Sequence, residues 1–200
     1  MAAPIEFFFD FSSPYSYLAC EQIEALAARH GRGVDYQPTL LGAVFRVSGM
    51  RPLTEIPVKG DYSRHDFLRS ARYAGLPFVM PEPFPISTVQ AARACHVLRA
   101  QAPALLREFV QRAFRAYFVQ GRNLAEAEVL RAVLDESGAP GARVLEDTGR
   151  PEVKEELKRA VEASIARGVF GAPFFFIDGE PFWGNDRLPQ MERWLASGPF

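Results

Sequence analysis

The chain has 200 residues, enough for one well-buried domain or for a core domain that carries one sizeable insertion. Hydrophobic residues make up 48% of it and charged residues 24%, a balance typical of globular proteins that argues against a disordered chain. The chain has 23 Lys and Arg residues and 24 Asp and Glu residues, so its formal net charge is −1. This balance predicts no general affinity for nucleic acid or for an anionic membrane surface.

A strand, a helix and a second strand are predicted at the start of the chain. Residues 5–11 are apolar and aromatic and run into a Ser-Ser-Pro turn, which is typical of a buried strand. Pro14 suits the first position of the next helix, which Ser12 or Ser13 can cap. Glycines 31 and 33 end this helix, and residues 34–37 form the second strand. The opening unit is therefore βαβ.

Helices dominate the predicted middle of the chain. Residues 39–60 are rich in Gly and Pro and are expected to be irregular, and a Pro-rich break spans residues 76–85. Apolar periodicity predicts helices over about residues 62–73, 88–100, 104–119, 126–137 and 139–147. We therefore expect residues 46–149 to form an inserted loop and an all-helical subdomain.

The last 50 residues are expected to complete the core. A helix follows Pro151, a second aromatic run spans residues 174–177, and Asp178-Gly179 is a hairpin signal before a return strand at 180–183. A final helix covers about residues 188–196. The order βαβ, helices, αββα predicts an α/β fold with a thioredoxin-like core made of residues 1–45 and 150–200.

The two cysteines give no sign of redox or metal chemistry. Cys20 and Cys95 form no CxxC pair and have no histidine at metal-ligand spacing, so we expect no disulfide, no metal site, and two buried, inert thiols. The N-terminal apolar run is short, is broken by Glu6 and Asp10, and lacks a basic start. These features argue against a signal peptide or membrane anchor, and a cytoplasmic protein is expected.

Ser13 is the candidate functional residue because it lies where a strand gives way to a helix. Free backbone N–H groups and the positive end of the helix dipole stabilise a thiolate or carboxylate there. The Ser13 hydroxyl has three possible roles: donor to a bound thiolate, nucleophile, or plain helix cap. A nucleophile needs a nearby base, and the chain has no Gly-x-Ser-x-Gly elbow. The residues alone favour the cap.

Other candidate ligand contacts lie far along the chain. The Ala172-Pro173 bond, ordinarily trans, would present the backbone before the proline to a ligand if it were cis. Asn185 and Asp186 can receive an ammonium group and a carboxylate, or simply cap the last helix. Lys59 is expected in a loop, where it either binds an anion or stays solvated. Residues 182 and 183, Phe and Trp, are expected to pack in the core or within the hairpin rather than against a ligand.

Three segments in this order and spacing resemble one known family. Residues 9–17 read FDFSSPYSY, residues 168–173 read GVFGAP, and residues 182–188 read FWGNDRL. The set resembles 2-hydroxychromene-2-carboxylate isomerases, close relatives of kappa-class glutathione transferases in the DsbA-like thioredoxin superfamily. The resemblance spans essentially the whole chain.

The resemblance implies a glutathione site. It places the family's catalytic serine at Ser13 and puts Ser16 at the second cysteine position of redox relatives. Because a hydroxyl cannot form a mixed disulfide, the thiol would have to arrive with glutathione. The backbone of the Ala172-Pro173 cis-proline loop would pair with the cysteinyl part of glutathione. The γ-glutamyl end would meet residues 185 and 186, and the lysine at 59 would lie near the glycyl carboxylate. The resemblance also suggests a homodimer.

The implied reaction converts 2-hydroxychromene-2-carboxylate to trans-o-hydroxybenzylidenepyruvate, a step of naphthalene-type aromatic degradation. Glutathione would be used catalytically, and a small aromatic molecule would be the substrate. Two other functions stay open: a kappa-like transferase that consumes glutathione, and a non-catalytic thioredoxin-like binding protein. Two positions depart from the family, which commonly has Asn where this chain has Met50 and often where it has Ser87. Both departures bear on the substrate.

Overall fold

A four-stranded mixed sheet forms the centre of the protein, whose computed structural model describes residues 2–200. The strands lie in the order β2 (Val34–Pro38), β1 (Ile5–Phe9), β3 (Phe174–Ile177) and β4 (Glu180–Trp183). β1 is parallel to β2 and antiparallel to β3, and β3 is antiparallel to β4. The register places Phe7 between Tyr36 and Phe175.

Aromatic side chains on the two central strands build the core on both faces of the sheet. Side chains alternate along a strand, so Phe7 and Phe9 share one face and Phe8 points to the other. Phe7 stacks on Phe175 of β3 at 5.1 Å between ring centroids. On the opposite face Phe8 joins a smaller buried cluster with Phe174 of β3. The Phe-rich runs at 7–9 and 174–176 are therefore sheet core.

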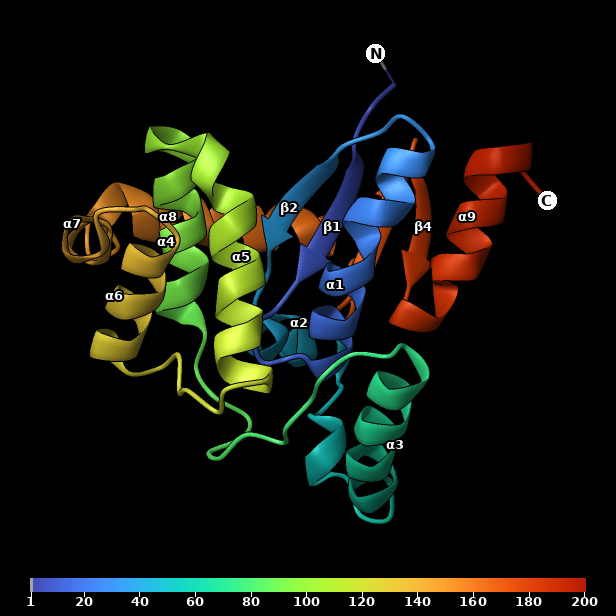
Figure 1. The fold of residues 1–200 in the computed structure, drawn as a ribbon, viewed down its shortest axis with the longest axis horizontal. Coiled ribbons are helices and arrows are strands. Elements are labelled where there is room, and N and C mark those ends of the chain that lie inside the picture. The colour runs from blue at the N-terminus through green and yellow to red at the C-terminus, as the bar shows by residue number, and fades with distance from the viewer. Residues whose placement is uncertain (1) are drawn as a thin grey trace.

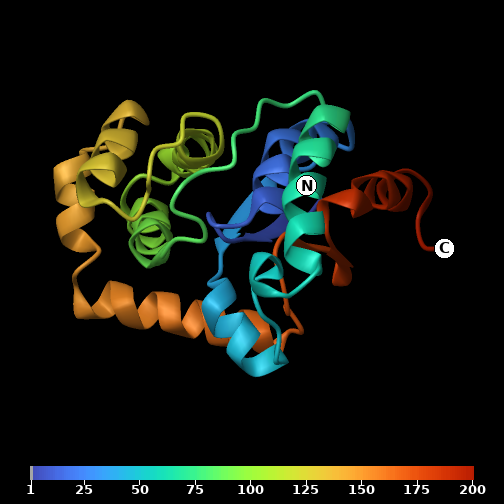
Figure 2. The ribbon, with the colours of Figure 1, turned by 90° about the horizontal axis from the view of Figure 1, so that it is seen from below.

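Nine α-helices are assigned in residues 2–200: α1 (Pro14–Arg29), α2 (Leu41–Ser48), α3 (Lys59–Tyr73), α4 (Val89–Gln101), α5 (Pro103–Phe118), α6 (Ala127–Glu136), α7 (Gly141–Asp147), α8 (Pro151–Ala166) and α9 (Leu188–Ser197). α1 lies against the sheet beside α9, and α4 to α7 form a helical block to one side (Figure 1). α3 lies beyond the N-terminal end of α1 (Figure 1). From below, α8 crosses from this block towards α2 (Figure 2).

The predicted α/β class and the order of strands and helices are confirmed, but the segment between β2 and α3 was predicted wrongly. Residues 39–60, expected to be irregular, contain α2 and a short 3-10 turn, Leu53–Glu55, and α3 begins at Lys59 rather than near residue 62. α2 has no side-chain cap of its own at Leu40, and the carboxylate of Asp10 accepts a hydrogen bond from the Leu41 amide at 2.7 Å. Its N-terminus is thus supported by a residue distant in sequence.

The expected subdomain boundary after residue 45 falls inside α2, whereas the boundary near 150 falls at the turn before α8. The first strand also ends at Phe9, two residues earlier than expected, because Asp10 opens the turn into α1. Across residues 2–200, no helix combines the length and the apolar character needed to cross a membrane.

Candidate active site

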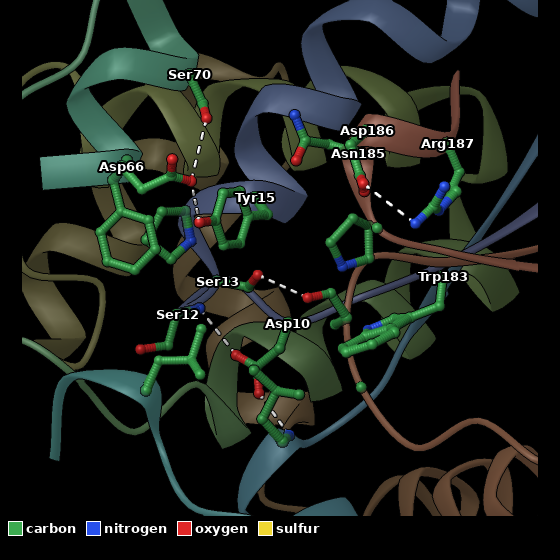
Figure 3. A pocket seen from close by; sticks show the side chains of 18 of the residues that line it. Asp10, Ser12, Ser13, Tyr15, Asp66, Ser70, Trp183, Asn185, Asp186 and Arg187 are labelled. Atoms are coloured by element: carbon green, nitrogen blue, oxygen red, sulfur yellow. Dashed lines mark hydrogen bonds and ion pairs between the residues drawn. The ribbon is translucent and has the colours of Figure 1, made fainter. Parts of the chain in front are cut away.

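A cavity of about 1380 Å³ opens at the N-terminus of α1. Its walls include the first turn of α1, residues 171–173, the turn after β4 with the start of α9, α2 with residues 50–54, part of α3, and residues 84–86. Pockets for a single small molecule usually measure about 300–1,000 Å³. The cavity therefore has room for two ligands side by side. Figure 3 shows Ser13, Tyr15 and Trp183 around its floor.

Ser13 caps α1 and also forms a hydrogen bond to the proline loop. Its backbone is extended (φ −98°, ψ 113°), and its Oγ accepts a hydrogen bond from the Ser16 amide at 3.1 Å. The same hydroxyl donates to the carbonyl of Ala172 at 3.0 Å. The capping interpretation is thus confirmed, and the bond to Ala172 ties the cap to a loop 159 residues away.

The Ala172–Pro173 peptide bond is cis. Both residues line the cavity, and the Pro173 carbonyl accepts a hydrogen bond from the Gly184 amide at 3.0 Å. This bond holds the proline loop beside the turn that carries Asn185 and Asp186, which also line the cavity. The structure thus brings five of the seven predicted site residues to one cavity.

The turn after β4 depends on glycine at position 184. Gly184 has φ 109°, a conformation that L side chains rarely adopt, and a Cβ there would collide with Asp186 Oδ1. Asp186 stays largely accessible, with 69% of its side chain exposed and Arg187 at 3.5 Å. Trp183, expected to pack in the core or within the hairpin, is 46% exposed and lines the cavity. Phe182 is buried as expected.

Ser16 and Lys59 do not line this cavity. Ser16 is fully buried, and its hydroxyl has no hydrogen-bond partner within residues 2–200, so it serves the site through its backbone amide. Lys59 was wrongly predicted to lie in a loop, because it is the first residue of α3, where it is exposed. Of the two family departures, Met50 lines the cavity and Ser87 does not.

Replacement of Lys59 by alanine is expected to change the glutathione dissociation constant by less than about twofold, because an exposed charge contributes little. Isothermal titration of glutathione into the wild type and the variant measures the change. A tenfold weaker constant in a folded variant would show that α3 moves to bring Lys59 to the ligand.

Asp10, beneath Ser13, is a site residue that the sequence analysis missed. Its Oδ1 accepts hydrogen bonds from the Ser12 amide and the Thr88 hydroxyl, each at 2.8 Å, and its Oδ2 accepts one from the Leu41 amide. The carboxyl group is buried yet reaches the cavity lining. Burial raises the pKa of Asp10, although these hydrogen bonds act to lower it. Its one signal in the sequence was a carboxylate at the end of an apolar strand.

A second acidic group joins α3 to the start of α1. The Tyr15 hydroxyl donates to Asp66 Oδ2 at 2.5 Å, and Ser70 and Arg69 donate to the same carboxylate (Figure 3 shows the Tyr15 and Ser70 bonds). Partial burial alone would raise the pKa of Asp66, but the bonds from Tyr15 and Arg69 outweigh it and lower that pKa. Burial, and then the bond to Asp66, raise the pKa of Tyr15. Tyr15 is therefore a hydrogen-bond donor at neutral pH.

The cysteines lie away from this chemistry. Cys20 and Cys95 are buried as predicted, and burial raises the pKa of both thiols. Neither lines the cavity. Within residues 2–200, no group of three or more His, Cys, Asp or Glu side chains is placed to hold a metal ion.

A double Cys20→Ala, Cys95→Ala variant is expected to keep its catalytic activity and to lose about 1 kcal/mol of unfolding free energy per site through weaker packing. Steady-state assays and urea denaturation measure the two effects. Loss of activity in a folded double variant would contradict the prediction.

Comparison with known proteins shows the family to which the chain belongs. The model of the DSBA-like thioredoxin domain matches residues 4–196, so the chain is a DsbA-like thioredoxin protein, and the predicted fold class is confirmed. The chain is 31% identical to a 2-hydroxychromene-2-carboxylate isomerase of Sphingobium xenophagum over 197 residues, 98% of this chain and 99% of that protein. It therefore belongs to the 2-hydroxychromene-2-carboxylate isomerase family.

Two further matches extend the comparison. The chain is 27% identical to glutathione S-transferase kappa 2 of Caenorhabditis elegans, with 98% of this chain and 92% of that protein covered. A solved 2-hydroxychromene-2-carboxylate isomerase superposes with a TM-score of 0.86 at 27% identity and covers 96% of this chain and 94% of that one. These relatives are isomerases and glutathione transferases, so the family resemblance inferred from the sequence is confirmed.

Proposed function

We propose that the protein is a glutathione-dependent isomerase that converts 2-hydroxychromene-2-carboxylate, or a related conjugated aromatic acid, to the open-chain trans-o-hydroxybenzylidenepyruvate. The observation that carries this proposal is the Ser13 hydroxyl, held at the N-terminus of α1 and aimed at the Ala172 carbonyl within a large cavity. The isomerases that resemble the chain over almost its whole length support the reaction class.

The cavity lining fits the chemical groups of glutathione. A thiolate is favoured at the N-terminus of α1, where the helix dipole and the Ser13 hydroxyl meet. The exposed carboxylate of Asp186 suits the γ-glutamyl ammonium, and the Asn185 amide suits its carboxylate. Between these groups the backbone of Ala172 is available to an extended peptide.

When bound, glutathione supplies a thiolate that adds to the conjugated carbon of the substrate and later leaves, which permits ring opening and rotation. In this role the Ser13 hydroxyl donates a hydrogen bond to the glutathione sulfur instead of to the Ala172 carbonyl. The Ser16 amide already donates to Ser13 Oγ, and a hydroxyl that accepts one hydrogen bond becomes a stronger donor in the next. Ser13 thus stabilises the thiolate in a preorganised position.

The proposed function also implies a cellular location, a pathway and an oligomeric state. A cytoplasmic location suits two thiols that remain free, and the reaction suits a pathway of aromatic degradation. The family resemblance also suggests a homodimer, which belongs to the same proposal. Gel filtration with light scattering measures the assembly.

A kappa-like transferase is the alternative, favoured by the kappa-class relative that matches 98% of the chain. It would use the same Ser13 site but would consume glutathione by conjugation. Incubation with 2-hydroxychromene-2-carboxylate and, separately, with a model electrophile separates the two functions. An isomerase leaves free glutathione unchanged after many turnovers, whereas a transferase depletes it with the electrophile.

Binding is tested without any substrate. Glutathione at 100 times its dissociation constant is expected to add about 2.7 kcal/mol to the free energy of unfolding. A thermal melt with and without millimolar glutathione measures the effect. An unchanged melting temperature would overturn the proposed function.

A further inference from the structure

The acidic side chains that line the cavity already have partners within residues 2–200. The carboxylate of Glu192 is paired with Arg29, and that of Asp186 lies 3.5 Å from Arg187. The carboxylates at positions 10 and 66 are held by the amide and hydroxyl donors described above. Four arginines line the same cavity, so its four acidic groups do not give it an excess of negative charge that would repel an anionic ligand.

Two cationic side chains of the same cavity form no ion pair within the described part of the chain. Arg46 lies on α2, and its Nε donates to the Gly42 carbonyl of its own helix at 3.3 Å, so its terminal nitrogens keep their donors. Arg51 lies in the segment after α2. The cavity therefore carries its unpaired positive charge on the wall made by α2 and the following residues.

This wall is fixed and apolar beneath the two arginines. Ala43 packs against the cluster that includes residues 157 and 161 of α8, so one face of α2 is anchored. Phe45, Met50 and Leu53 line the cavity beside Arg46 and Arg51. At position 50 the wall presents an apolar methionine side chain, so the positive charge of this wall comes from the two arginines.

We propose that Arg46 and Arg51 bind the carboxylate of a planar aromatic or conjugated acid, whose apolar body lies against Phe45 and Met50. Arginine presents a planar fork of donors that matches a carboxylate and binds it with two parallel hydrogen bonds. The inference deepens the proposed function, because it assigns the second ligand of the cavity. The groups that fit glutathione lie at the start of α1 and on the β3–β4 side, and of the remaining walls the α2 wall carries the two unpaired arginines.

The experiment compares two probes that differ only in charge. Isothermal titration measures trans-cinnamate and its uncharged amide, cinnamamide, on the wild type, on an Arg46→Gln, Arg51→Gln variant, and on Arg72→Gln as a control. Arg72 is an exposed arginine of α3 that does not line the cavity. We expect the wild type and the control to bind cinnamate at least about tenfold more tightly than cinnamamide, and the double variant to lose this preference.

Glutathione titrated into the same three proteins separates the two sources of a carboxylate. The proposal expects its dissociation constant to stay within about twofold in all of them. If the double variant weakens glutathione and not cinnamate, the arginines hold the glycyl carboxylate and the proposal is overturned. An unchanged cinnamate preference in the double variant, or none in the wild type, also overturns it. If glutathione does not bind to the wild type but the cinnamate preference is intact, the proposed function is overturned and the arginine site is not. Circular dichroism checks that the variants fold.

Discussion

Replacement of Ser13 by alanine is expected to lower kcat by about 10²–10³-fold, the usual effect of removing one preorganised donor from a developing or bound anion. The variant keeps the helix dipole of α1 and the Ala172 backbone, so glutathione should still bind. Without the hydroxyl, however, its sulfur is less well stabilised as a thiolate at neutral pH. The variant also loses the cap to the Ser16 amide, a cost of about 1 kcal/mol of unfolding free energy.

Three measurements separate chemistry from stability. Steady-state kinetics at saturating glutathione give kcat, ultraviolet absorbance of the bound thiolate against pH gives the thiol pKa, and urea denaturation gives the free energy of unfolding. We expect kcat to fall while the pKa of the bound thiol rises. An unchanged thiol pKa would mean that the Ser13 hydroxyl does not stabilise the thiolate.

Ser16→Ala is the matched comparison, because Ser16 lies one turn further along the same helix. Its hydroxyl is fully buried without a hydrogen-bond partner in the described residues, so its removal leaves no group unsatisfied. We expect kcat to stay within about twofold of the wild type and the unfolding free energy to be unchanged or slightly higher. A loss comparable to that of Ser13→Ala would bring the Ser16 hydroxyl into the reaction.

The frame of the fold could be predicted from local sequence, because its signals are short-range. Pro14 at the first position of α1 and the apolar runs of β1 and β3 each report on their own segment. The hairpin between β3 and β4 could also be predicted from its own residues. Asp178 and Gly179 adopt φ 53° and 92°, the positive values that this dipeptide favours. Each of these elements forms from preferences that neighbouring residues share.

What sequence reasoning missed depends on contacts between distant segments. α2 begins at Leu41 because of a carboxylate 31 residues away, and no local cap announces it. Lys59 was placed in a loop because the residues before it suggested an irregular segment, whereas α3 starts there. The bond between Tyr15 and Asp66 likewise joins residues 51 positions apart. Only the fold shows which polar groups meet.

The Ser13 site itself lies between these two cases. Residues near Ser13 identified a helix cap, while the family resemblance placed Ser13 and the Ala172-Pro173 loop at one glutathione site. The structure adds the physical connection, since the hydroxyl donates to the Ala172 carbonyl. It also shows that Ser16 and Lys59 do not line the cavity. The family resemblance therefore locates the site in the fold more reliably than it identifies each residue that contacts the ligand.

Replacement of Asp10 by asparagine is expected to lower the free energy of unfolding by about 1–3 kcal/mol, the cost of one buried donor left unsatisfied. Asparagine has a single acceptor oxygen where Asp10 has two. If that oxygen faces Ser12 and Thr88, the new amide group faces the Leu41 N–H, and the reverse orientation opposes the Ser12 N–H. Either way one backbone amide at the cavity wall loses its acceptor.

The catalytic effect of Asp10→Asn should exceed what the lost stability explains. The two amides open the turn before Ser13 and the first turn of α2, so both walls of the cavity loosen together. We expect kcat/KM to fall by about tenfold or more at a temperature where the variant is fully folded. Asp61→Asn, an exposed carboxylate on α3, serves as the control and should change stability by less than about 0.5 kcal/mol.

The stability difference between wild type and Asp10→Asn should also depend on pH. Burial, opposed by the three hydrogen bonds, raises the pKa of Asp10 above its ordinary value of 3.8, so the folded state binds this proton more tightly than the unfolded state. Its contribution to stability is therefore greatest below pH 3.8 and falls as pH rises through the raised pKa. The variant has no titrating group at this position. Urea denaturation of both proteins across the acidic range should show their difference shrinking as pH increases. A difference that grows with pH would show that the donors from Ser12, Leu41 and Thr88 outweigh burial and hold Asp10 as a carboxylate.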